Sequence, residues 1–221
     1  VTSETLYIPN CLDIYPDKVS ELNNLDIISV GRLESGKCID DLITLFKNIV
    51  NWNKDVKLKI VGEGSQRRLL EEKIKELSLE NNVILTGNKN KEELGDFYLD
   101  SSLFVMTSRT ESFGLVLVEA GSYGIPVLAY DTAQGAKEII ENDQNGFLIK
   151  NRNKEEMIEK IKETLVSALI ENVRLNGLLD KMKKRNEYLQ KQVQHLDQHL
   201  EQMKKENVDF RKEIVMFHQI K

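Results

Sequence analysis

The chain has 221 residues, of which 40% are apolar and 30% are charged, with a formal net charge of −5 at pH 7. This apolar fraction excludes a wholly disordered chain, and the length suits one domain, or one domain with an extension. No run of about 18 apolar residues occurs, so no transmembrane helix is expected. The mild acidity argues against nucleic acid as the main partner.

The two cysteines, Cys11 and Cys38, form neither a CxxC pair nor a cluster with metal-ligand spacing. This pattern fits a reducing compartment, and each thiol is expected to be buried as a small hydrophobic group. The chain begins without Met and shows no signal peptide. We therefore expect a fragment of a cytoplasmic protein, with a peripheral place at the membrane as the alternative.

Glycine and charge divide the sequence into two parts. Eleven of the twelve glycines and all three prolines lie before residue 147, and only Gly177 follows. Residues 165–221 hold 11 Lys and Arg against 8 Asp and Glu, a net charge of +3, so the preceding part carries −8. Turn chemistry therefore stops near Gly146, and a different kind of structure is expected after it.

The first part alternates short apolar runs with amphipathic stretches. Strands are expected at residues 25–30, 56–61, 83–85, 103–106, 126–129 and 146–149. Helices are expected at residues 39–50, 66–77, 91–98, 115–123 and 136–141, and from residue 154 onward. This alternation with short connections predicts an α/β fold, in which a parallel sheet carries helices on both faces. Ligands of such sheets bind beyond the carboxyl ends of the strands.

The second part carries a seven-residue repeat that starts at Leu165. Its a positions are Leu165, Asn172, Leu179, Asn186, Val193, Leu200, Asn207 and Ile214. This register predicts a coiled coil over residues 165–221, and the three Asn favour a parallel dimer, with a trimer as the alternative. A long helix packed on its own domain would also explain the apolar positions.

Two of the loops that follow predicted strands are ambiguous on their own. The first holds Gly31, Arg32 and Lys37, and its two cations suit phosphate oxygens at a helix start. Taken alone, an ordinary turn with solvated cations explains it better. The second loop, residues 62–65, has two glycines around Glu63 that permit close approach of a ligand, but a tight turn is the simpler interpretation.

The third loop, within residues 108–120, is the most informative. Glu111 lies in the loop, and Glu119 lies about one turn into the following helix. Both carboxylates are expected to face the crevice, where they can accept hydrogen bonds from sugar hydroxyls, and the free N–H groups at the helix start can bind oxygens. Helix capping is the alternative role for Glu111, whereas Glu119 lies in an otherwise apolar helix and needs a partner.

Together these loops resemble the carboxy-terminal, donor-binding domain of retaining GT-B glycosyltransferases of the family-four type. The matching segments are residues 7–14, 30–43, 60–70, 83–98, 101–131 and 137–149. The combined spacing of Arg32, Lys37, Glu111 and Glu119 makes the resemblance specific, and it covers roughly residues 6–165.

The resemblance implies a role for each candidate residue. Arg32 and Lys37 would bind the donor diphosphate and stabilise its charge as it leaves, and Glu111 would hold the donor sugar hydroxyls. Glu119 would accept the ribose hydroxyls. The remaining members of the implied site are Gly31, Gly62, Glu63, Asn88, Phe113, Gly114 and Leu115. The resemblance implies a nucleotide diphosphate sugar as the donor. No suitably placed DxD motif occurs, so no metal cofactor is expected.

The resemblance also implies a domain layout. Residues 1–20 would be a linker from a missing amino-terminal acceptor domain, and residues 21–164 a Rossmann-like nucleotide-sugar-binding domain, followed by the coiled coil for oligomerisation or spacing. The loop at residues 131–135 departs from the adjacent glycines that are frequent in the family. Without the acceptor domain, the chain is expected to bind its donor and turn over little. A sugar-nucleotide epimerase and a non-catalytic scaffold for the coiled coil are the alternatives.

Overall fold

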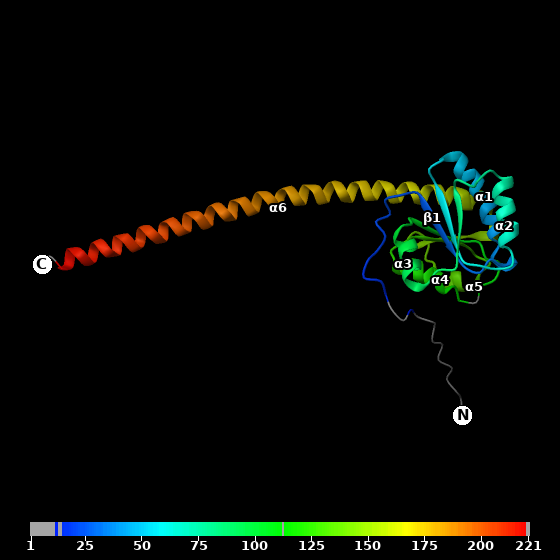
Figure 1. Cartoon of the computed structure of the whole chain (residues 1–221), viewed down its shortest axis with the longest axis horizontal. Coiled ribbons are helices and arrows are strands. Elements are labelled where there is room, and N and C mark those ends of the chain that lie inside the picture. The colour runs from blue at the N-terminus through cyan, green and yellow to red at the C-terminus, as the bar shows by residue number, and fades with distance from the viewer. Residues whose placement is uncertain (1–11, 13–14, 112, 220–221) are drawn as a thin grey trace, which may run out of the picture. The chain divides into compact units, whose positions relative to one another are not determined.

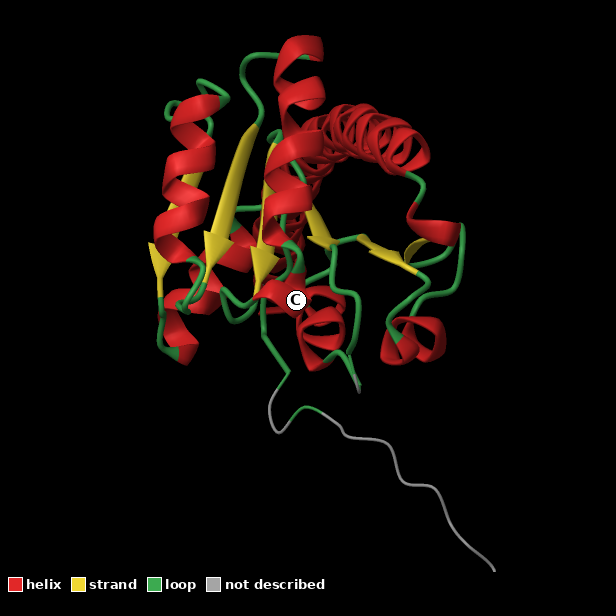
Figure 2. Cartoon of the chain, turned by 90° about the vertical axis from the view of Figure 1, so that its right-hand side faces the viewer, coloured by secondary structure: helices red, strands yellow, loops and turns green. Residues whose placement is uncertain are grey.

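The computed structural model describes residues 12, 15–111 and 113–219 and contains a six-stranded parallel sheet (Figures 1 and 2). The strands are β1 (Asp26–Val30), β2 (Lys57–Val61), β3 (Val83–Gly87), β4 (Leu103–Met106), β5 (Val127–Tyr130) and β6 (Gly146–Ile149). They lie in the order β3-β2-β1-β4-β5-β6, and every neighbouring pair is parallel. The order reverses between β1 and β4, which is where ligands bind in Rossmann-like sheets.

Helices cover both faces of the sheet. They are α1 (Ile39–Trp52), α2 (Arg67–Glu76), α3 (Lys91–Leu99), α4 (Leu115–Ser122), α5 (Gln134–Ile139) and α6 (Lys154–Gln219), with short 3-10 turns η1 (Ser35–Lys37) and η2 (Lys150–Arg152). Residues of α1, α2 and the start of α6 form one buried cluster with the sheet, and residues of α3, α4 and α5 form the other. The predicted α/β architecture is therefore confirmed.

The central strands β1, β2, β4 and β5 form where the sequence predicts them because most of their side chains are buried on both faces, whereas the edge strands β3 and β6 are only partly buried. Ile27 and Ile28 are adjacent in β1 and fully buried, and they belong to opposite clusters. Such strands read as largely apolar runs, and glycine directly follows β1 and β2. The predicted bounds differ from the observed ones by at most two residues. The 3-10 turns at η1 and η2 were not predicted, since neither has an apolar period.

The helix α6 begins at Lys154, as expected, and contributes first to the domain. The chain divides into one compact unit that ends at Asn172 and a second, Val173–Lys221. Leu165 is fully buried in the same cluster as Met157 and Ile161. The interpretation of Leu165 as a coiled-coil position is therefore wrong, because the domain itself buries this side chain.

Asn172, the next a position, also contacts the domain. Its side-chain amide donates a hydrogen bond to the carbonyl of Glu21. The expected domain boundary between residues 164 and 165 thus falls inside a helix whose first turns belong to the domain core. The coiled coil after Val173 stays a prediction.

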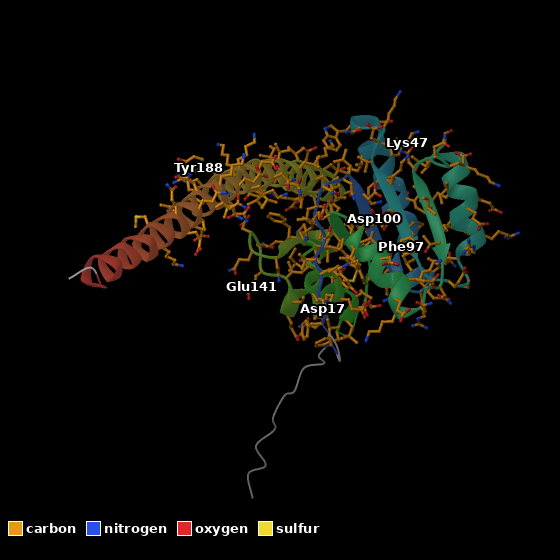
Figure 3. All side chains as sticks on the ribbon, turned by 60° about the vertical axis from the view of Figure 1, so that its left-hand side comes forward. Asp17, Lys47, Phe97, Asp100, Glu141 and Tyr188 are labelled. Atoms are coloured by element: carbon orange, nitrogen blue, oxygen red, sulfur yellow. The ribbon has the colours of Figure 1, made fainter. Side chains whose placement is uncertain are left out.

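Beyond Asn172, α6 keeps its predicted apolar positions exposed. Their side chains are 46–69% exposed at Leu175, Leu179, Met182, Leu189, Val193, Leu196 and Met203. Figure 3 shows side chains standing away from this helix, Tyr188 among them. The side chains of Leu200 and of the repeat positions from Asn207 onward lie outside the described part of the structure.

The structure bears on two expectations: the burial of the cysteines and the absence of a transmembrane helix. Cys38 is buried, as expected for a small hydrophobic group, whereas Cys11 and most of the predicted linker lie outside the described residues. In the part of the chain that the structure describes, every helix is too short or too polar to cross a membrane. The predicted cytoplasmic or peripheral location stays a prediction.

Candidate functional site

The loops after β1 and β2 pack against each other through their backbones. The N–H of Gly31 donates to the carbonyl of Val61 at 3.0 Å, and the N–H of Leu33 donates to Glu63 at 2.8 Å. A Cβ added to Gly62, whose φ is +141°, would lie 2.0 Å from the carbonyl oxygen of Gly31. The glycine thus permits close approach of the chain's own loop, and the turn interpretation of residues 62–65 accounts for it.

A polar pocket opens where these loops meet the loop after β4. It has a volume of about 450 Å³ and is lined by Arg32, Glu34, Gly36, Lys37, Thr110, Glu111, Thr132 and Gln134. The ammonium of Lys37 forms an ion pair with the carboxylate of Glu111, 74 residues away in sequence. The three residues predicted to act on the diphosphate and the sugar, Arg32, Lys37 and Glu111, therefore lie in one pocket.

Arg32 and Glu34 line the same pocket, and Glu34 fixes the loop that carries them both. Ser65 donates to Glu34 through its hydroxyl at 2.8 Å and its backbone N–H at 3.2 Å. These hydrogen bonds hold the pKa of the Glu34 carboxyl below its usual value. Glu34 therefore stays ionised at neutral pH and ties the loop after β1 to Ser65 in the loop after β2.

The loop that carries Glu111 is held by the start of α5. The N–H of Gly135 faces the carbonyl of Glu111 at 3.4 Å, and a Cβ on Gly135 would lie 1.8 Å from the carbonyl oxygen of Phe113. Gly114, at φ +81°, then caps α4. A single glycine at 135 therefore gives the close approach between α5 and this loop, although the adjacent glycines frequent in the family are absent.

Arg152 joins several elements behind the polar pocket, and nothing in the sequence pattern marked it. Its guanidinium donates to the carbonyl of Thr107 at 2.9 Å and to the carboxylate of Asp41 at 2.9 Å. It also lies over the ring of Tyr130, 4.4 Å from the ring centroid. The hydroxyl of Thr107 in turn donates to the carbonyl of Cys38 at 3.0 Å. Arg152 thereby fixes the end of β4 relative to the start of α1.

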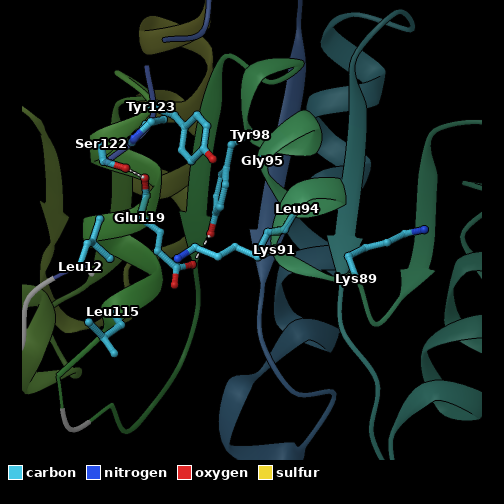
Figure 4. Close-up of a pocket in the computed structure, with 11 residues that line it drawn as sticks. Leu12, Lys89, Lys91, Leu94, Gly95, Tyr98, Leu115, Glu119, Ser122 and Tyr123 are labelled. Carbon is cyan, nitrogen blue, oxygen red and sulfur yellow. Dashed lines mark hydrogen bonds between the residues drawn. The ribbon is translucent and has the colours of Figure 1, made fainter. Parts of the chain in front are cut away.

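Glu119 lies in a second pocket of about 360 Å³, which we call the Glu119 pocket (Figure 4). It is lined by Leu12, Pro16, Lys89, Lys91, Leu94, Gly95, Tyr98, Leu115, Glu119, Ser122 and Tyr123. The hydroxyl of Tyr98 donates to the Glu119 carboxylate at 3.0 Å. This tyrosine is the partner that a carboxylate in an apolar helix requires.

Glu111 lines the polar pocket, and Leu115, four residues later at the start of α4, lines the Glu119 pocket. The predicted site residues Gly31, Gly62, Glu63, Asn88, Phe113 and Gly114 are not among the described residues that line either pocket. Glu63 instead pairs with Arg67. Ser112 lies outside the described residues.

Among the pocket residues that no sequence signal marked are Lys91, at the start of α3, and Tyr98, on an ordinary apolar helix face. Thr132 and Gln134 line the polar pocket and belong to the loop at residues 131–135 that departs from the family pattern. Within residues 15–111 and 113–219, no group of three or more His, Cys, Asp or Glu side chains is placed to hold a metal ion.

Comparison with known proteins places this geometry in a family. Residues 14–188 match the family model described as "Glycosyl transferases group 1". The chain belongs to this family. The resemblance to GT-B glycosyltransferases of the family-four type is thereby confirmed.

Several bacterial proteins are similar to this chain. The chain is 33% identical over 159 residues to an uncharacterized glycosyltransferase of Haemophilus influenzae. The aligned region covers 72% of this chain and 44% of that protein. It is 37% identical over 134 residues to the Staphylococcus aureus poly(ribitol-phosphate) alpha-N-acetylglucosaminyltransferase, covering 60% and 26% of the two chains. It therefore spans less than half the length of these relatives.

A solved structure agrees in fold. A mutant of S. aureus TarM, in complex with Fondaparinux, alpha-GlcNAc-glycerol and UDP, superposes with a TM-score of 0.64 at 28% identity. The match covers 75% of this chain and 34% of TarM. This partial coverage is consistent with a carboxy-terminal donor-binding domain.

Proposed function

We propose that this chain is the donor-binding half of a retaining glycosyltransferase, which transfers a sugar from a nucleotide diphosphate sugar to a polysaccharide, glycan or protein acceptor. One observation carries the proposal: Arg32 and Lys37, which follow β1, and Glu111, which lies 74 residues after Lys37, line one polar pocket. Two cations suit a diphosphate, and a carboxylate suits sugar hydroxyls. The UDP complex of the related TarM supports this donor class.

In this proposal the polar pocket acts on the bond that breaks. The bond between the anomeric carbon of the sugar and the donor phosphate oxygen breaks, and its electron pair stays on the diphosphate. Arg32 and Lys37 stabilise that charge, without a metal ion. The acceptor oxygen bonds to the same carbon on the same face, and its proton passes to the departing phosphate oxygen, so the anomeric configuration is retained.

Donor binding changes the partner of Lys37. In the structure its ammonium is neutralised by Glu111. A diphosphate in the polar pocket offers more negative charge than one carboxylate, so the ammonium turns to the phosphate. Glu111 is then available to the sugar hydroxyls, while Glu119 in the neighbouring pocket accepts the ribose hydroxyls. Asn88, in the loop after β3, lies on the base side in this assignment.

Calorimetric titration with uridine and guanosine diphosphates tests donor binding. We expect Lys37→Ala to weaken binding at least about tenfold, because it removes a charge-assisted contact to phosphate. Lys191→Ala, on the exposed part of α6, is the matched control and should leave the affinity unchanged. Absence of binding to any nucleotide would favour the scaffold alternative, and interconversion of a donor sugar without acceptor would favour an epimerase.

The acceptor site belongs to the other domain of a GT-B enzyme, so we propose that this chain alone binds donor but turns over little or none. The chain spans 44% of the Haemophilus relative, which leaves room for such a domain in that protein. A transfer assay with the isolated chain tests this. Robust sugar transfer to any acceptor would contradict it.

We also propose that residues 173–221 form a coiled coil between copies of this chain. The apolar repeat positions of Leu175, Leu179 and Met182 are 47–69% exposed, which is costly for side chains of this size unless a partner covers them. Parallel pairing places Asn186 opposite its own copy, where the two amides satisfy each other. Sedimentation equilibrium should give a dimer, with a trimer as the alternative. A monomer at micromolar concentration would contradict oligomerisation.

A further inference from the structure

We propose that Tyr98 is a positioning residue for nucleotide binding: its buried hydroxyl holds the Glu119 carboxylate in the orientation that receives the ribose diol. This inference rests on the proposed donor-binding function, and it concerns a residue that no sequence motif marked. The hydroxyl lies 3.0 Å from Oε2 of Glu119 (Figure 4). The bond joins α3 to α4, the two helices that line the Glu119 pocket.

The chemistry of Tyr98 makes it a permanent donor. The side chain is 1% exposed. Burial raises the pKa of its hydroxyl well above the usual value, and the neighbouring Glu119 charge raises it further. The phenol therefore keeps its proton throughout the neutral range, and Glu119 always meets a donor and never a phenolate.

The ring of Tyr98 is itself fixed. It stacks on the ring of Tyr123, with centroids 5.1 Å apart and planes 24° apart, and lies 6.4 Å from the ring of Phe104. Tyr123 reaches this position because residue 95 is glycine: a Cβ there would lie 2.7 Å from the Tyr123 hydroxyl. The hydroxyl of Tyr98 therefore has little freedom to follow Glu119, and the carboxylate must orient toward the hydroxyl.

A fixed carboxylate suits a vicinal diol. Tyr98 is the one hydrogen-bond partner of the Glu119 side chain among the described residues, so the remaining lone pairs of both carboxylate oxygens are available to a ligand. The 2′- and 3′-hydroxyls of a ribose can each donate to one oxygen. A free glutamate would lose rotamer entropy on binding, and the bond from Tyr98 removes part of that cost beforehand.

The test compares uridine diphosphate with 2′-deoxyuridine diphosphate by calorimetry on the full chain. The unchanged protein should bind uridine diphosphate about tenfold more tightly than the deoxy form, because the deoxy form lacks one donor to Glu119. We expect Tyr98→Phe to reduce this preference to about twofold, close to that of Glu119→Ala. Tyr188→Phe removes a hydroxyl from a side chain on α6 that is 53% exposed and lines neither pocket, so it should retain the full preference.

The outcomes separate this inference from the proposed function. If the unchanged protein binds no nucleotide, the proposed function fails. If it prefers uridine diphosphate and Tyr98→Phe keeps the same preference, or weakens both ligands equally, Tyr98 has only a structural role and the inference is overturned. The double variant Tyr98→Phe with Glu119→Ala completes the cycle: the tyrosine change should then have no further effect on the preference. An additional loss there would also overturn the inference.

Discussion

The domain and the later part of α6 contain the same type of apolar residue, but the side chains are buried in the domain and exposed on the later part of the helix. Leu165 and Leu179 both occupy the a position of one repeat, yet Leu165 is fully buried and Leu179 is 47% exposed. The sheet and its helices bury Leu165 within one chain, whereas no described side chain from Val173 onward belongs to a buried cluster. A sequence period thus shows which face is apolar, and the surroundings decide what covers it.

Glycine gives the largest expected contrast between the two regions. Gly62→Ala should destabilise the protein by about 4 kcal/mol, because overpacking against Gly31 and the strain at φ +141° each cost about 1–3 kcal/mol. Gly177→Ala should stabilise α6 by up to about 1 kcal/mol, since its Cβ meets no atom within 4 Å. Denaturant unfolding of both variants measures the two signs. An equal change in the free energy of unfolding in both variants would show that the loop after β1 does not contact the loop after β2.

The two leucines provide the next contrast. Leu165→Ala should lower the free energy of unfolding by about 3 kcal/mol, because it leaves a cavity in a closed core. Leu179→Ala should leave thermal unfolding of the domain unchanged and weaken self-association instead. Differential scanning calorimetry combined with sedimentation measures both. A comparable loss of domain stability in the two variants would place Leu179 against the domain.

Ion pairs provide a smaller contrast, with a pH dependence. Burial alone would raise the pKa of Asp41, but hydrogen bonds from Lys154 and Arg152 outweigh it and lower the pKa in the folded protein. The unfolded chain therefore binds the proton first, so this contribution is fully present above the ordinary pKa near 3.8 and is lost as pH falls through the folded value.

Asp41→Asn should consequently cost about 1–2 kcal/mol at pH 7 and flatten the decline in stability below about pH 4. The matched control is Glu201→Gln, which breaks an exposed pair with Lys204 on α6 and should not change stability measurably. Urea unfolding at a series of pH values gives both results. If the free energy of unfolding of Asp41→Asn fell at low pH as steeply as that of the unchanged protein, another carboxylate would be responsible for the decline.

Removal of residues 173–221 should have the smallest effect on the domain. The described core closes with Leu165, so the melting temperature of the shortened chain at neutral pH should stay within about 2 °C of the full-length value. Its nucleotide affinity should also be unchanged, while self-association should be lost. Circular dichroism and sedimentation test this, and precipitation or melting at a much lower temperature would show that the domain depends on the second unit.

Much of the fold could be predicted because its signals are local. The six strands are short, mostly apolar runs, and five of them are followed within one or two residues by a glycine or a charged residue. The observed bounds differ from the predicted ones by no more than two residues. Arg32, Lys37 and Glu111 could be proposed because the carboxyl ends of parallel strands meet at one edge. The resemblance to a family then supplied roles that spacing alone left open.

The remaining features depend on contacts between distant residues. Arg152 binds Asp41 across 111 residues and Lys37 pairs with Glu111 across 74, and neither partner lies at a spacing that predicts the other. Gly135 is explained only by the carbonyl of Phe113 that passes beside it. Tyr98 resembles any apolar helix residue until Glu119 is placed opposite its hydroxyl.

The sequence by itself therefore determined the succession of strands and helices along the chain, the edge of the sheet where the site lies, and the apolar face of α6. Each of these follows from periodicity and from glycine positions. Only the tertiary structure decided that Leu165 belongs to the domain, that the two glycine loops contact each other, and that Tyr98 is the partner of Glu119. The physical reason is that burial and hydrogen-bond pairing depend on which elements meet in space, and a local pattern does not contain that information.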